Sequence, residues 1–452
     1  MPAPAFTPRA ILCALLAGVA SGPVAAAELP LEMPSYHDDK GNELTPSLSL
    51  EGAFFPQGQS WFGKSKDNLG ETSDYWFEQV GKLALTGQAA LDGYGTIYGK
   101  MSGIFTATQR TDAAGSDVPN DTPTDLAWED AYVGWRSANL LESSLGSDAI
   151  DLSYGRQRYQ VGSGFLFWDG GSDGGQRAAY WIGPRKAFKQ AAIAKVTTHG
   201  VEARGVYLEP NDNPHSETKL YGLDLQWGTE DLGSVGGGFY HIADSGIDTR
   251  DGMNVYDIRA DVTPLKGKEI LPGLALKGEF TYEKNGDTQE GFGYYGELGY
   301  DFGESLPWTP YLSYRYAHFS GDDPNSSKDQ NFDPLFYGFS DWGTWFQGEI
   351  LGEYVLLNQN LNSSTIRLTA SPTDDLKLNL LYYYFWLDDA EGFGTSGSSF
   401  ADEVDLTADY TLNDHVFFSL VGGVANPRNG ASNYTGGNNL WSYGMFYTNI
   451  TF

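Results

Sequence analysis

The sequence predicts an all-β, single-chain, transmembrane antiparallel β-barrel of about 18 strands. Segments of about ten residues that alternate apolar with polar side chains recur along the chain, which is the pattern of tilted bilayer-spanning strands. The turns between them are rich in Gly, Asp, Asn and Pro, and 57 Gly, 28 Tyr and 25 Phe are spread from end to end. Past the N-terminus no run of 18 apolar residues exists, which argues against membrane-spanning helices.

The first 27 residues have the pattern of a secretory signal peptide. Arg9 precedes an apolar run over 10–20, then Gly22, Pro23 and a small-residue cleavage site ending at Ala27. Cys13, the single cysteine, lies inside this run and lacks the small residue that precedes a lipidated cysteine, so we expect a mature chain without disulfides. The predicted organisation is a signal peptide (1–27), a periplasmic lead-in (28–44) and the barrel (45–452).

The strands are read from the alternation itself. Leu274, Leu276 and Phe280 share one face, and Lys277 and Glu279 share the other. The same pattern holds in segments 82–91, 97–105, 221–227, 292–302, 366–370, 376–386 and 404–410. A soluble β-sandwich would also alternate, but the aromatic residues gather near segment ends, where the girdles of a barrel lie.

Loop lengths assign the two ends of the predicted barrel. The short turns 231–233, 372–374 and 413–414 are predicted to be periplasmic, and the long connections 111–125, 321–336 and 388–401 to lie outside. The long loops are rich in Asp, which usually means a solvated surface. Binding of a structural cation by these loops is an alternative that the sequence leaves open, although no twelve-residue calcium-loop spacing is present.

No catalytic constellation is found in the sequence. The six histidines have no metal-ligand spacing, and no nucleophile elbow occurs. We therefore expect no catalytic residue, no bound metal and no cofactor.

One stretch, 154–195, runs against the charge of the chain. It carries seven basic residues and two acidic ones in a protein of net charge −31. Such a stretch either meets an anion, as rings of Arg and Lys do in pores, or pairs with carboxylates on neighbouring strands. The second reading names Glu129, Asp130, Asp151 and Glu202 as partners, and the two readings are compatible.

In a regular strand, the arginines at the start of this stretch would lie on the lipid-facing side. Arg156 and Arg158 share the parity of the apolar Leu152 and Tyr154, so a regular strand would point both arginines at lipid. That would cost about 2 to 4 kcal/mol for each near the midplane. We therefore expect either a bulge that changes the register after Tyr154 or a strand that has left the hydrocarbon band by that point. We favour the bulge or a loop folded inward, which places this stretch at the constriction.

Two sets of residues resemble the alginate-export family. Gly155-Arg156-Gln157, a Gly-rich loop and Arg185-Lys186-Ala187-Phe188 are similar to a strand and a later basic pair of that family. Residues 332–339, beginning Phe-Asp-Pro-Leu, and 341–349, ending Trp-Phe-Gln-Gly-Glu, resemble a second segment and the strand after it. The resemblance implies a monomeric barrel of about eighteen strands that passes an anionic polysaccharide across the outer membrane.

The resemblance also selects candidate residues for the lumen. The matching motifs point to Arg156, Arg158, Arg185 and Lys186, and strand parity adds Arg315 and Arg367. In Asp333-Pro334 we expect loop shape rather than chemistry. The wet faces depart from an Arg-rich lumen, because they also carry carboxylates such as Glu403, Asp405 and Asp409.

The sequence therefore predicts a bacterial outer-membrane channel, not an enzyme, that passes an anionic, alginate-like polysaccharide or its oligomers through a lumen lined by Arg and Lys. A general or uptake porin for small solutes is the alternative, and an outer-membrane enzyme or adhesin is a third reading. The expected partners are the anionic polysaccharide or small anionic solutes, outer-membrane lipid, and the barrel assembly machinery, through the C-terminal strand ending at Phe452. We expect no nucleic-acid partner. We expect the protein to be a monomer.

Overall fold

The computed structural model describes residues 33–64, 73–110, 123–171, 177–213, 215–338 and 347–452. Residues 34–452 form one compact unit. The predicted signal peptide, most of the loop 111–125 and residues 341–346 of the second motif lie outside the described residues. Because the signal peptide is not described, its removal stays a prediction.

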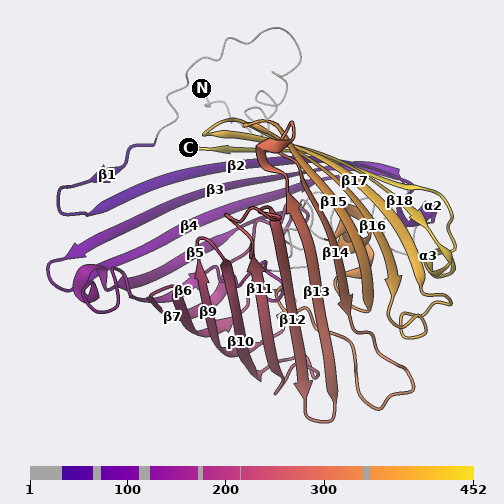
Figure 1. Ribbon diagram of the computed structural model, residues 1–452, viewed down its shortest axis with the longest axis horizontal. Coiled ribbons are helices and arrows are strands. Elements are labelled where there is room, and N and C mark those ends of the chain that lie inside the picture. The colour runs from indigo at the N-terminus through magenta and orange to yellow at the C-terminus, as the bar shows by residue number, and fades with distance from the viewer. Residues whose placement is uncertain (1–32, 65–72, 111–122, 172–176, 214, 339–346) are drawn as a thin grey trace, which may run out of the picture. The chain divides into compact units, whose positions relative to one another are not determined.

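Strands make up most of the described residues (Figure 1). They are β1 (Tyr36–His37), β2 (Glu43–Gly58), β3 (Ser73–Leu91), β4 (Gly95–Gln109), β5 (Thr124–Arg136), β6 (Ile150–Gln157), β7 (Phe188–Thr198), β8 (Val201–Glu209), β9 (Lys219–Thr229), β10 (Gly233–Asp244), β11 (Asn254–Val262), β12 (Leu274–Asn285), β13 (Gln289–Asp301), β14 (Tyr311–Phe319), β15 (Leu361–Thr373), β16 (Leu376–Leu387), β17 (Ser399–Asn413), β18 (Val416–Pro427) and β19 (Trp441–Thr451). The short helices are α2 (Ser60–Gly63), η2 (Ala138–Leu141), η3 (Gly303–Ser305), α3 (Asn429–Thr435) and the π-helix η5 (Gly348–Leu356). None of the helices in the described segments has the length and apolar character needed to cross a membrane.

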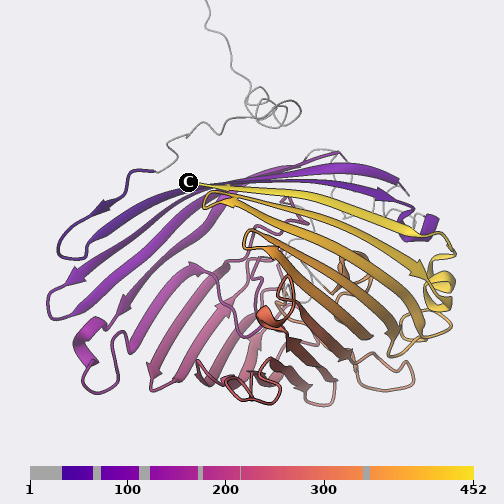
Figure 2. The same ribbon diagram turned by 45° about the horizontal axis from the view of Figure 1, so that its top comes forward.

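The sheet closes on itself. From β2 to β19 each strand pairs antiparallel with the next, and β19 returns to β2 through pairs from Ser442↔Gly58 to Thr451↔Ser49. Figures 1 and 2 show the indigo β2 beside the yellow β19. Within the described residues the wall is a closed antiparallel barrel of 18 strands, as predicted. Closure satisfies backbone hydrogen bonds that hydrocarbon cannot satisfy and leaves no open edge.

The two faces of the wall have the predicted polarity. Leu225 and Ile258 point outward and are 56% and 64% exposed, whereas Glu279 and Thr281 point inward and are 4% and 0% exposed. Outward rings gather near strand ends, as in the stacked pair Tyr384 and Trp386, whose centroids are 5.1 Å apart. The outward face is therefore an apolar band with aromatic residues at its edge, as expected of a lipid-facing surface.

The connections also differ between the two ends. Because neighbouring strands are antiparallel, the short turns 92–94, 199–200, 230–232, 374–375 and 414–415 all lie at one end, together with the start of β2 and the end of β19. The long connections 158–187, 320–360 and 388–398 lie at the other end.

Three segments from this second end fold into the barrel. We call residues 158–171 and 177–187 the first inner loop and residues 320–338 the second inner loop; the third segment is η5. Phe165, Phe332 and Ile350, one from each segment, are fully or almost fully buried. The connection 321–336 lies at the end predicted to be outside, but its part from Phe332 onward folds into the barrel, which was not predicted. Its acidic residues suggested a solvated loop, but its aromatic residues are buried inside the wall.

Candidate channel constriction

The wall changes register where β6 leads into the first inner loop. The pairing of β6 with β7 shifts between Gly155 and Gln157, which confirms the predicted change of register. Gly155 has φ of +134°, and a Cβ there would lie 2.3 Å from the carbonyl oxygen of Ala131. Only glycine fits this position without strain. Arg156, which follows, is half-buried and interacts electrostatically with Glu129, Arg177 and Arg185 on the inner side of the wall.

The two inner loops are joined by backbone hydrogen bonds. The N–H groups of Trp168 and Asp169 both donate to the carbonyl of Phe336, at 2.8 and 2.9 Å, and Phe336 N–H donates to Leu166 at 3.0 Å. Aromatic rings complete the contact, with Phe165 and Phe332 centroids 5.7 Å apart. The loops therefore form one apolar partition that narrows the lumen.

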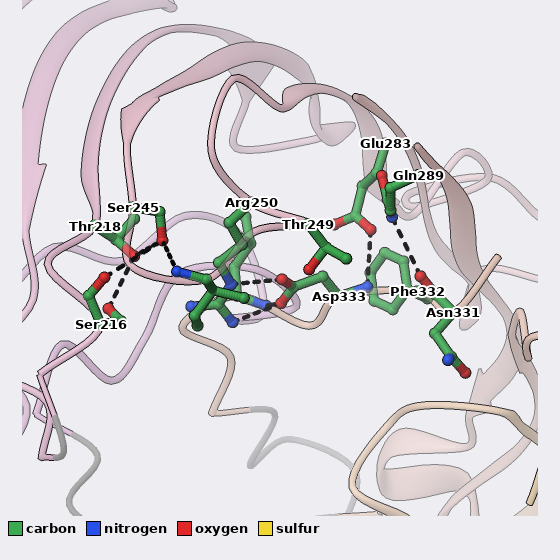
Figure 3. Close-up of polar contacts among 12 residues, drawn as sticks. Ser216, Thr218, Ser245, Thr249, Arg250, Glu283, Gln289, Asn331, Phe332 and Asp333 are labelled. Atoms are coloured by element: carbon green, nitrogen blue, oxygen red, sulfur yellow. Dashed lines mark hydrogen bonds and ion pairs between the residues drawn. The ribbon is translucent and has the colours of Figure 1, made fainter. Parts of the chain in front are cut away.

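An ion pair holds the second inner loop to the connection between β10 and β11 (Figure 3). Arg250 donates two hydrogen bonds to Asp333, with Nε 2.5 Å from Oδ2 and Nη2 2.6 Å from Oδ1. The backbone N–H of Asp333 donates to Glu283 of β12 at 2.8 Å. Asp333 Oδ1 also accepts the N–H of Leu335 at 2.9 Å, so this side chain shapes the loop, in keeping with the expectation for Asp333-Pro334.

Inward glutamates of the wall hold the inner segments by their backbones. Each accepts hydrogen bonds from two successive N–H groups. Glu78 of β3 accepts those of Trp181 and Ile182 at 3.3 and 3.0 Å, Glu129 of β5 those of Lys186 and Ala187 at 2.8 and 3.0 Å, and Glu403 of β17 those of Ile350 and Leu351, both at 2.8 Å. All three are at most 1% exposed. Much of the acidic wet face is thus buried under the loops rather than lining open water.

The role of these glutamates was not predicted from the sequence. One signal was present at Glu129 and Asp130. Successive residues on a regular strand point to opposite faces, so two adjacent acids in a lipid-facing strand imply a bulge. The pairing of β4 with β5 does shift there, and both residues are buried. The acceptors' partners, in contrast, are backbone groups far away in sequence, which no side-chain pattern reveals.

Three of the six predicted lumen residues form ion pairs with two carboxylates. Arg185 forms an ion pair with Asp125 and is 4% exposed. Arg315 donates from Nε to Glu297 at 2.7 Å, and Arg367 reaches the same carboxylate at 3.2 Å. These residues lie on the lumen side of the wall, but their charges are engaged in ion pairs that stabilise it.

The other three predicted residues, Arg156, Arg158 and Lys186, form no ion pair within 4.0 Å with any carboxylate of the described residues. Arg158 is exposed, and Lys186 lies over the ring of Trp168, its Nζ 4.6 Å from the centroid. Burial lowers the pKa of Lys186 to about 8, and the nearby charge of Arg158 adds to the shift. The base of the first inner loop therefore concentrates cations that the fold does not neutralise with an ion pair.

The carboxylates expected to pair with the basic stretch mostly have other partners. Asp130 bridges Lys82 and Lys100, at 2.9 and 3.1 Å. Asp151 accepts the hydroxyl of Tyr98, and Glu129 binds backbone N–H groups. Only Glu202 pairs with the stretch, through Lys195 at 3.9 Å. The other three form no ion pair with the stretch among the described residues, although Glu129 attracts Arg156, because neighbouring strands and the first inner loop supply their hydrogen-bond partners.

Between the two inner loops lies a cavity of about 140 Å³. Its lining includes Trp168, Arg185, Lys186, Tyr337 and Glu353. It joins aromatic faces to cations beside the carboxylate that η5 contributes. In the part of the chain that the structure describes, no group of three or more His, Cys, Asp or Glu side chains is arranged to hold a metal ion.

Comparisons with known proteins agree with this architecture. Residues 101–433 match the model of a family described as alginate export. Among solved structures, OccK5 (OpdH) of Pseudomonas aeruginosa is similar with a TM-score of 0.57 at 12% identity, covering 90% of this chain and 97% of that one. OccAB4 of Acinetobacter baumannii gives a TM-score of 0.55 at 12% identity, covering 93% and 98%. At such identities the likeness shows the fold alone, that of an outer-membrane porin. No curated protein matches the chain.

Proposed function

The chain belongs to the alginate export family and forms a channel in the bacterial outer membrane, and we propose that this channel selects anions and passes acidic saccharides, as an alginate-like polymer or its oligomers. One observation carries the proposal. Arg156 and Arg158 lie where the chain enters the first inner loop and Lys186 where it leaves it, and none of the three forms an ion pair among the described residues. Family and fold point to a channel rather than an enzyme.

Unpaired cations at a constriction favour anions for a simple electrostatic reason. A guanidinium stays charged at any physiological pH and binds a carboxylate through two parallel hydrogen bonds. In a narrow lumen, little water screens this attraction. The glutamates that would oppose it, Glu78, Glu129 and Glu403, are buried and occupied by backbone N–H groups.

Saccharides are favoured over small inorganic anions by the aromatic residues beside the cations. Trp168 and Tyr337 line the cavity that contains Lys186. Aromatic faces pack against the apolar faces of sugar rings, and the ammonium supplies a partner for the sugar's carboxylate. A repeating acidic sugar offers one such group per unit, so no single contact has to hold it tightly.

A second candidate is uptake of small anionic solutes one at a time. It is favoured by the inner loops themselves, whose aromatic core, with Phe165 and Phe332 in contact, partitions the lumen. If the two inner loops stay in contact in the working channel, only short acidic saccharides can pass.

Ion selectivity tests the proposal. Reversal potentials across a planar bilayer with a KCl gradient should show preference for chloride in the wild type. The triple variant Arg156→Ala, Arg158→Ala, Lys186→Ala should lose most of it. Lys219→Gln is the matched control, because Lys219 is an exposed lysine already paired with Asp244, away from the inner loops. Cation preference in the wild type, or unchanged selectivity in the triple variant, would refute the proposal.

Liposome swelling separates the two candidates. Acidic oligosaccharides of increasing length should enter faster than neutral ones of equal size. Passage of long acidic oligomers supports the polysaccharide route, and a cut-off at one or two sugar units supports uptake of small solutes.

A further inference from the structure

A bulge in β5 turns two neighbouring carboxylates into the barrel. Against β4, Gly103 pairs with Trp128 and Met101 with Ala131, so Glu129 and Asp130 together lie opposite the single residue between those positions of β4. Trp128 remains 58% exposed on the lipid side, while Glu129 and Asp130 are 0% and 3% exposed. Asp130 forms ion pairs with Lys82 and Lys100, but Glu129 forms none among the described residues.

Glu129 binds the backbone at Lys186 instead of a cation. Its Oε1 accepts the N–H groups of Lys186 and Ala187, at 2.8 and 3.0 Å. Its Oε2 is buried and has no hydrogen-bond partner in the described part of the chain. A fully buried carboxylate with an oxygen that accepts no hydrogen bond is unfavourable. The bulge that creates this arrangement therefore destabilises the wall unless Glu129 contributes something else.

The charges around Lys186 indicate what that contribution is. Arg158 of the same loop repels its ammonium, while Asp169 of the loop, Glu51 of β2 and Glu129 of β5 attract it. Burial already works against the charged form. Glu129 differs from the other two carboxylates because it also fixes the backbone from which Lys186 projects.

We infer that Glu129 is a positioning residue for Lys186: it places the lysine beside Trp168 and keeps its ammonium protonated in a desolvated site. This inference rests on the proposed anion selectivity. It predicts a change in anion preference opposite to the one expected from the net charge alone. Removing a negative charge from an anion channel should increase anion preference, but removing this one should decrease it near neutral and alkaline pH, because Lys186 then loses its proton more easily.

Glu129→Gln tests the inference, since glutamine keeps an oxygen that accepts the two N–H bonds and removes only the charge. Reversal potentials are measured from pH 6 to pH 10. Wild-type anion preference should fall with a midpoint near pH 8, set by Lys186. In Glu129→Gln the midpoint should move to lower pH, because one of the carboxylates that attract the ammonium is lost. At pH 6, where Lys186 is protonated in both proteins, the variant should be at least as anion-selective as the wild type.

Asp130→Asn is the matched control, because it makes the same change of charge on the adjacent residue of the bulge. It should raise anion preference at every pH and leave the midpoint unchanged. An unchanged midpoint in Glu129→Gln, with raised preference at pH 8, overturns the inference.

A second variant guards against a Glu129→Gln protein that fails to assemble. Glu129→Asp keeps the charge but withdraws the oxygens from the two N–H groups, so anion preference should fall below wild type even at pH 6. Wild-type behaviour of Glu129→Asp also overturns the inference. Failure of the proposed function looks different: the wild type shows no anion preference, or Lys186→Gln leaves both the preference and its pH dependence unchanged.

Discussion

Arg250 and Asp333 are joined at two points, and this pair ties the second inner loop to the connection between β10 and β11. Their side chains are 13% and 17% exposed, so both charges are largely removed from water. A buried charge that loses its partner is strongly destabilising, whereas the intact pair adds less to stability than its attraction suggests. The pair therefore controls where the loop sits more than how stable the barrel is.

Asp333→Asn should loosen the second inner loop. Arg250 would be left without its carboxylate at a cost of about 3 kcal/mol, and the loop would leave its place part of the time. Single-channel recordings should then show higher and noisier conductance, with the barrel still resistant to detergent. Asp323→Asn is the control, since Asp323 is an exposed acid of the same loop that binds only the nearby Asn325. Equal recordings from both variants would contradict the proposed role of the pair.

Glu403→Ala should release η5 from the wall. The variant removes the acceptor of two charge-assisted hydrogen bonds, each contributing about 1.5 to 3 kcal/mol. Open-channel conductance should rise, and limited proteolysis should cut near 348–356. Asp409→Ala changes another inward acid of β17, one bound by the Ser419 hydroxyl at 2.7 Å rather than by η5. Protection of η5 in both variants would show that Glu403 does not hold the helix.

Anion preference in the wild type should depend on pH through Lys186. The pKa of this lysine is lowered to about 8, chiefly by burial. The ammonium is therefore present below pH 8 and lost above it, so anion preference should be full near pH 6.5 and decline by pH 9.5. Lys186→Arg should flatten this profile, because a guanidinium stays charged across the whole range. A flat profile in the wild type would place the selective cation elsewhere.

Gly155→Ala should impair assembly of the barrel. At φ of +134° the new Cβ would lie 2.3 Å from the Ala131 carbonyl oxygen, so the register change in β6 could not form. A regular strand would then turn Arg156 toward lipid, at about 2 to 4 kcal/mol. The fraction of folded protein, read from its heat-modifiable migration in gels, should fall sharply. Gly296→Ala in β13 is the control, since a Cβ added at Gly296 would meet no atom within 4 Å, and this variant should fold normally.

Much of the wall could be predicted from the sequence. The strand number, the lipid and lumen faces and the closure of the sheet follow from alternation, because the pleat forces successive side chains to opposite faces whatever the rest of the chain does. Even the irregularity after Tyr154 was predictable, since two arginines on the lipid parity have a known energetic penalty.

The inner segments were harder to predict. The loop 321–336 was expected outside because of its length and solvated because of its aspartates, yet one of its acids, Asp333, is bound by Arg250, which is 83 residues away in the sequence. Phe332 and Phe336 are buried beside residues of the first inner loop. A local pattern shows that a loop is acidic or aromatic, but not which distant surface will cover it.

The sequence by itself determined that this protein is an outer-membrane barrel with a concentrated basic stretch, because alternation, length and charge are local properties of the chain. Only the tertiary structure decided which cations remain available. Arg185, Arg315 and Arg367 meet Asp125 and Glu297, while Arg156, Arg158 and Lys186 are left without an ion pair among the described residues. The reason is physical: an ion pair depends on distances of a few ångströms across the closed wall, and those distances are set when the inner loops fold against it.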